Sequence, residues 1–99
     1  MKEYNTNFVH LGGDIVVNKR DIIGIFDIKL ASKSKNTKNF LNICNKEGFV
    51  SKITEEETRS FIMVNIKGNK NKENKYSGIH VYYSPITSLT LQKRACSSY

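Results

Sequence analysis

The sequence predicts an α+β fold: a small single domain of about six short, mainly antiparallel strands with one central helix and a short C-terminal helix. The chain has 99 residues, which is enough for one hydrophobic core and too few for two. Short apolar runs rich in β-branched and aromatic residues recur between glycines and charged steps, as is typical of strands, and one longer segment has helical spacing. We expect the domain to span residues 8–95, after a flexible polar leader at 1–7 and before a polar tail at 96–99.

The first two expected strands, Phe8–Leu11 and Asp14–Val17, form a hairpin around Gly12-Gly13. Glycine adopts the positive φ of short hairpin turns without steric cost. A two-residue connection would place Leu11 opposite Asp14, His10 opposite Ile15 and Val9 opposite Val16. Val9 and Leu11 would then share one face, with Phe8 and His10 on the other.

Four further runs are expected to be strands: Ile22–Phe26, Phe49–Ile53, Phe61–Ile66 and Ile79–Tyr83. The first of these is apolar on both faces, which favours a central strand that is covered on both sides. Gly24 within it indicates a bulge or a close approach of another part of the backbone.

Two helices are expected. The clearer one spans Ser34–Glu47, with Ser34 as N-cap and an apolar face that ends at Cys44. Gly48 suits the left-handed position after its end, where Phe49 would contact Cys44 in a Schellman-type cap. Ser84-Pro85 would start the second helix, Ile86–Ala95, with Ile86 and Leu89 on one side.

The charge balance is basic, because 16 Lys and Arg residues outnumber nine Asp and Glu residues and give a formal net charge of +7. Such an excess favours DNA, RNA or an anionic membrane surface as partner, although a generally lysine-rich surface has the same composition. The lysine-rich stretch Lys67–Gly78 has no apolar residue before Tyr76 and is expected to be a mobile loop.

The sequence contains no recognisable catalytic or metal-binding motif, so we expect no enzyme activity, no cofactor and no metal. One histidine beside one aspartate, His10 and Asp14, is a weak pattern that strand edges often show. Cys44 and Cys96 have no metal or redox spacing and are expected to be free thiols. No stretch is apolar enough to span a membrane and no secretory signal opens the chain, so we expect a soluble intracellular protein.

Two stretches together resemble one family: Val9–Asp14 with Asp21–Asp27, and Tyr82–Ala95. Lys46–Val50 and Arg59–Ile62 fit the same pattern, so the likeness covers nearly the whole chain. The family is the RemA/RemB family of bacterial extracellular matrix regulators, and the chain is more similar to its RemB branch. The resemblance implies a cytoplasmic regulator of extracellular-matrix (biofilm) gene expression. It also implies DNA as partner and a homo-oligomer, since the RemA branch binds DNA and assembles into rings.

With DNA as the expected partner, the candidates for phosphate contacts are five cations: Lys19, Arg20 and Arg59, and, as weaker candidates, Lys93 and Arg94. Each protomer would neutralise only about two or three phosphates, so an oligomer would be needed for useful affinity. Two of the choices have alternatives. Arg59 could pair with the neighbouring Glu55–Glu57 at the surface, and Lys93-Arg94 could simply complement the dipole of the last helix.

The chain departs from the family at three places, one of which is the polar leader before Phe8. Glu56 and Glu57 stand where RemA carries adjacent arginines that contribute to DNA binding, and only Arg59 remains nearby. The Lys67–Lys75 stretch is longer than the tight hairpin expected of the family. The reversed charge supports an alternative function, in which the chain is a protein-interaction module that modulates a RemA-like regulator without binding DNA itself.

Overall fold

The computed structural model describes residues 7–66 and 78–96, and within them it confirms the α+β class. The leader before residue 7, the 67–77 part of the lysine-rich stretch and the tail after Cys96 lie outside the described residues. In chain order, the elements are β1 (Phe8–Gly12), β2 (Ile15–Asn18), the 3₁₀ turn η1 (Lys19–Asp21), β3 (Ile22–Asp27), α1 (Lys29–Lys33), α2 (Lys35–Lys46), β4 (Val50–Lys52), β5 (Ser60–Asn65), β6 (Ile79–Ser84) and α3 (Ser88–Cys96).

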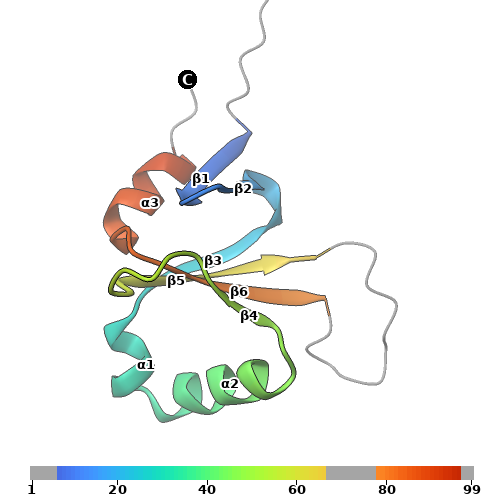
Figure 1. The fold of residues 1–99 in the computed structure, drawn as a ribbon, viewed down its shortest axis with the longest axis vertical. Helices are drawn as coiled ribbons and strands as arrows, with labels where there is room; N and C mark the ends of the chain where they lie inside the picture. The colour runs from blue at the N-terminus through green and yellow to red at the C-terminus, as the bar shows by residue number, and fades with distance from the viewer. Residues whose placement is uncertain (1–6, 67–77, 97–99) are drawn as a thin grey trace, which may run out of the picture.

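The elements form three layers (Figure 1). The middle layer is a four-stranded sheet of order β3-β5-β6-β4, in which β4 runs parallel to β6 and the other pairs are antiparallel. The β1-β2 hairpin and α3 cover one face, and α1 and α2 cover the other. Each face has its own core. The buried residues on the hairpin side are Val9, Leu11, Ile62, Val64 and Leu91, and those on the α2 side are Leu41, Cys44, Phe61 and Val81.

The register of the hairpin differs by one residue from the expected one. His10 lies opposite Val16 and Val9 opposite Val17, and the ladder shifts between His10 and Gly12. Gly12 and Gly13 both have positive φ, 122° and 52°, so the chain takes up an extra residue at Leu11 before it turns. The expected faces are nevertheless confirmed, because Val9 and Leu11 are buried and Phe8 is exposed.

The expectation that Ile22–Phe26 is a central strand is wrong, because β3 pairs with β5 alone and forms an edge of the sheet. Ile23 is 53% exposed, so the strand is not covered on both faces either. The irregularity expected at Gly24 is confirmed, since the ladder between β3 and β5 shifts between Ile22 and Gly24. A Cβ atom on Gly24 would lie 2.5 Å from Cζ of Phe26, so the close approach comes from a ring of the same strand.

The caps of α2 confirm the expected helix. The Ser34 hydroxyl accepts a hydrogen bond from the Thr37 N–H at 3.2 Å. At the other end Gly48 has φ 80°, and the Phe49 N–H donates to the Cys44 carbonyl at 2.8 Å, as a Schellman cap requires. The short helix α1 immediately before Ser34 was not expected from the sequence.

The last helix begins later than expected. Ser84 ends β6 and is fully buried, and Thr87 takes the capping position by accepting from the Thr90 N–H at 3.3 Å. On α3, Leu91 is buried while Leu89 is 62% exposed, which corrects the expected apolar face. In the described part of the chain, no helix has the length and apolarity to cross a membrane.

Candidate nucleic-acid interface

Lys19 and Arg20 form the 3₁₀ turn η1 between the hairpin and the sheet. The side-chain oxygen of Asn18 accepts from the Arg20 N–H at 3.0 Å, and the Lys19 N–H donates to the Asn7 carbonyl. These bonds order the backbone of the turn. Lys19 is half-buried, whereas the Arg20 guanidinium is exposed and has no hydrogen bond or ion pair with the residues that the structure describes.

Arg59 stands just before β5, at the opposite end of the sheet. Its backbone is held on both sides, since its N–H donates to the Ser84 carbonyl at 2.8 Å and its carbonyl accepts from the Ile28 N–H at 3.0 Å. Its side chain is exposed and, within residues 7–66 and 78–96, makes no ion pair with Glu55–Glu57. Arg59 lines a hollow of about 290 Å³ together with Lys29, Asp27 and Glu57. The charge around Arg59 is therefore mixed.

Lys93 and Arg94 lie in the last turn of α3, as expected, and both are exposed. Arg94 has a structural contact as well, because its Nη1 donates to the His10 carbonyl at 2.8 Å and so joins α3 to β1. A guanidinium has five N–H donors, so this bond leaves others for an anion.

The structure does not bring the five candidate cations together. In the antiparallel pair of β3 and β5, Ile22 lies opposite Val64 and Asp27 opposite Ser60. Lys19-Arg20 therefore precede β3 at one end, and Arg59 precedes β5 at the other, about 20 Å away by the length of a six-residue strand. Lys93 and Arg94 lie on a third element.

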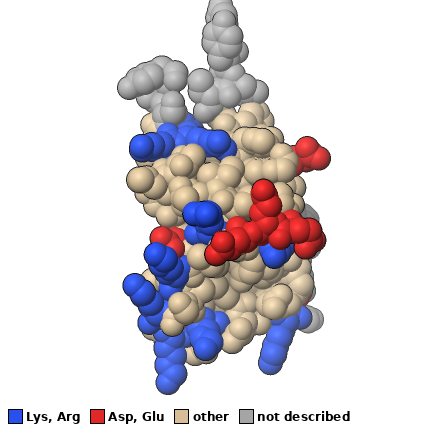
Figure 2. All heavy atoms as spheres, turned by 60° about the vertical axis from the view of Figure 1, so that its left-hand side comes forward, with Lys and Arg blue, Asp and Glu red and all other residues tan. Residues whose placement is uncertain are grey.

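The surface charge is divided in the same way. Figure 2 shows acidic side chains gathered across the middle of one face, with Lys and Arg side chains above and below them. Glu55, Glu56 and Glu57 are all exposed, and Glu56 is ordered by its N–H bond to the Thr54 hydroxyl at 3.2 Å. This face therefore offers a polyanion separate basic areas rather than one continuous groove.

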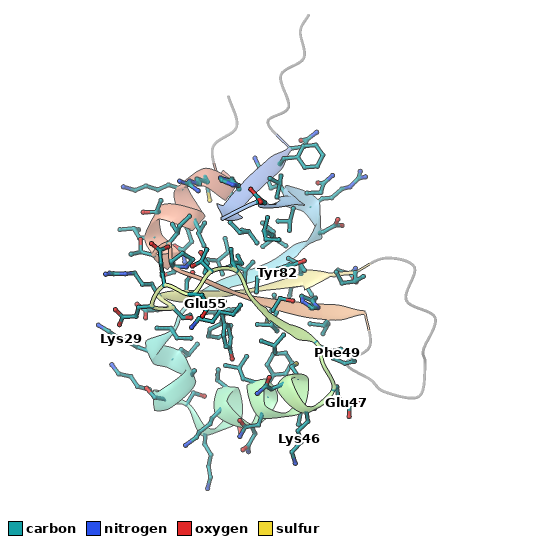
Figure 3. All side chains as sticks on the ribbon, in the orientation of Figure 1. Lys29, Lys46, Glu47, Phe49, Glu55 and Tyr82 are labelled. Atoms are coloured by element: carbon teal, nitrogen blue, oxygen red, sulfur yellow. The ribbon has the colours of Figure 1, made fainter. Side chains whose placement is uncertain are left out.

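A group of lysines lies on α1 and α2 that was not predicted as one group from the sequence. Its five exposed lysines are Lys29, Lys33, Lys35, Lys38 and Lys46. Lys46 points away from the sheet at the end of α2 (Figure 3). Because α1 was not expected, the first two lysines could not be grouped with those of α2; the dense lysine spacing from residue 29 onward was the available signal.

The other reactive side chains are two histidines and two cysteines. His10 Nε2 lies 2.7 Å from the Gly13 carbonyl, so this imidazole braces the hairpin turn. Cys44 and Cys96 are free thiols, and burial raises the pKa of Cys44. Burial lowers the pKa of His80, whose Nε2 lies 2.8 Å from the Ser51 hydroxyl. Within the described residues, no group of three or more His, Cys, Asp or Glu side chains could hold a metal ion.

Comparison with known proteins agrees with the resemblance seen in the sequence. The family model described as RemA-like, extracellular matrix regulatory protein A-like, matches residues 8–95. The chain belongs to the RemA-like family. It is also 38% identical over 88 residues to extracellular matrix regulatory protein B of Bacillus subtilis (strain 168), and the match covers 89% of each chain. The RemA-like match spans every element described above, from the start of β1 nearly to the end of α3.

Proposed function

We propose that this chain is a cytoplasmic bacterial regulator of extracellular-matrix gene expression that binds DNA phosphates weakly and gains affinity as a homo-oligomer, for example a closed ring. Its membership of the RemA-like family and its similarity to an extracellular matrix regulatory protein support the regulatory role. The observation that carries the mechanism is the placement of exposed cations on separate elements of a chain with net charge +7. The proposed action is binding, with no catalytic step.

The separation of the cations explains why an oligomer is needed. One protomer would contact about two or three phosphates with Arg20, Lys19 or Arg59, and so few contacts give low affinity at physiological salt. Linking copies raises the effective concentration of each further contact and can increase the overall affinity about 10²–10⁴-fold. Because each contact releases counterions, log affinity should fall with log salt by about 0.9 for every phosphate neutralised.

The experiment is a salt-titrated DNA-binding measurement, combined with size measurement by light scattering at several protein concentrations. Replacing Arg20 and Arg59 together by Gln should weaken binding to all sequences alike and make the salt slope less steep. The matched control removes two charges elsewhere, at Lys38 and Lys46 on α2, and should leave the slope closer to that of the unaltered protein. Absent binding at about 50 mM salt, or binding insensitive to salt, would refute the proposal.

A second function is favoured by the exposed acidic turn. Glu55, Glu56 and Glu57 lie beside Arg59, where they repel phosphates and suit a basic protein surface. In this alternative the chain is a protein-interaction module that modulates a RemA-like regulator without binding DNA. Recovery of a RemA-like partner in a pull-down treated with nuclease would support it, and reversal of the three glutamates to lysine should abolish that recovery. Strong DNA affinity of an isolated monomer would count against it.

A further inference from the structure

The end of the β1-β2 hairpin away from its turn carries a hollow of about 420 Å³. Its lining combines one aromatic ring, two amides and two cations: Phe8, Asn7, Asn18, Lys19 and Arg20. The volume lies within the range of small-ligand pockets. The hollow is partly open and its lining has more apolar than polar surface, which suits a ligand that combines a flat apolar group with a charged one.

Phe8 is placed in this hollow by the alternation of the strand. Val9 and Leu11 point into the core, so Phe8 points to the other face, where it stays 48% exposed. The register sets it opposite Asn18, immediately before the Lys19-Arg20 turn. A flat apolar ring therefore lies next to two positive charges on an ordered backbone.

This combination is the one used to bind single-stranded nucleic acid. Successive cations follow the phosphates, and an aromatic ring stacks on an unpaired base. Within a duplex both faces of a base are already stacked, so Phe8 can contribute only when the nucleotide is unpaired. Arg20 suits a phosphate because the guanidinium is exposed and the turn that carries it is held by Asn18.

We propose that this hollow binds one unpaired nucleotide of single-stranded DNA, with its base stacked on Phe8 and its phosphate on Lys19 and Arg20. The proposal rests on the proposed function and names a substrate class for it, DNA that is locally open. The amide of Asn18 uses its oxygen for the Arg20 N–H, so its NH₂ group is the donor left to face the edge of the base. Because every base has a flat face, we expect little preference among sequences.

The test uses the absence of tryptophan from this chain. Phe8→Trp places a single indole in the hollow, and stacking on a base quenches indole fluorescence. Oligothymidylate should quench it, whereas a strand of the same length and charge with abasic sugars should not. Leu89→Trp is the matched control, because Leu89 is 62% exposed on α3 and outside the hollow, and it should respond alike to both strands.

Affinity provides the second measurement. Phe8→Leu keeps an apolar side chain of similar size without a stacking face, and circular dichroism checks that it folds. The ratio of oligothymidylate affinity to duplex affinity should fall about 5- to 150-fold, which is the range for loss of one stacked base. Phe8→Tyr keeps the ring and should keep the ratio.

The outcomes separate this inference from the proposed function. An unchanged ratio in Phe8→Leu, or equal quenching by the abasic strand, overturns the nucleotide site even if duplex binding by Arg20 and Arg59 remains. If the unaltered protein shows no salt-dependent binding to either duplex or single-stranded DNA, both the nucleotide site and the proposed function are overturned. A ratio that falls in Phe8→Leu and is retained in Phe8→Tyr supports the site.

Discussion

Replacing Ser84 by alanine should be among the most destabilising polar substitutions in this chain. Ser84 has no exposed surface, and its hydroxyl donates to the Leu11 carbonyl at 2.6 Å while it accepts from the Ile86 N–H at 3.0 Å. Leu11 lies at the irregularity of the hairpin, where it has no partner in register with β2. Alanine leaves one buried carbonyl and one half-buried N–H without partners, at a cost of about 2–3 kcal/mol in the free energy of unfolding.

For a domain of this size that cost corresponds to a fall in Tm of about 10–20 °C, measured by thermal unfolding followed by circular dichroism. Ser60→Ala is the matched control. Ser60 is equally buried, but with the described residues its hydroxyl makes one hydrogen bond, to the Ile86 carbonyl at 2.7 Å. We expect about half the effect there. A Ser84→Ala variant that unfolds at or above the Tm of Ser60→Ala would show that the link between β6 and β1 does not stabilise the fold.

Two further stability predictions follow from the sheet. Gly24→Ala should cost about 1–3 kcal/mol, because its Cβ would collide with the Phe26 ring, which stacks on Phe61 with centroids 5.1 Å apart. Denaturant unfolding measures this loss, which should shrink in a Phe26→Leu background; an equal loss in both would exclude the collision. For His80, burial lowers the pKa below its ordinary value of 6.5, so the folded state favours the neutral ring. The stabilisation that comes from keeping His80 neutral is fully present above its ordinary pKa of 6.5 and is lost as the pH falls through the lowered pKa. The fall in Tm from pH 7.5 to pH 5 should therefore be smaller in His80→Gln, and an identical fall would exclude His80 as its source.

Local signals in the sequence were sufficient for the ends of α2. Ser34, Gly48 and the Cys44–Phe49 contact each depend on residues within one turn of the helix end, and all three were predicted. The inward positions Val9 and Leu11 were also predictable, because alternation along a strand requires no knowledge of its partner. By contrast, the register of the hairpin depended on whether Leu11 would form a bulge. The buried carbonyl of Leu11 accepts its hydrogen bond from the Ser84 hydroxyl, 73 residues away.

For the candidate cations, too, the residues could be predicted from the sequence but their arrangement could not. Lys19, Arg20, Arg59, Lys93 and Arg94 could be chosen from charge and position in the sequence, yet their separation depended on the antiparallel pairing of β3 with β5. The hollow beside Phe8 likewise required the pairing of β1 with β2, because Phe8 and Arg20 are twelve positions apart in the chain.

The sequence by itself determined which segments are the six strands and the two longer helices, the capping of α2, the net positive charge and the family. Only the tertiary structure decided that β3 is an edge strand, that Leu91 rather than Leu89 faces the core, and that the cations occupy separate areas. The physical reason is the range of the interactions. Caps and alternation are satisfied by near neighbours, whereas strand order and helix orientation follow from the burial of apolar surface between segments distant in the chain.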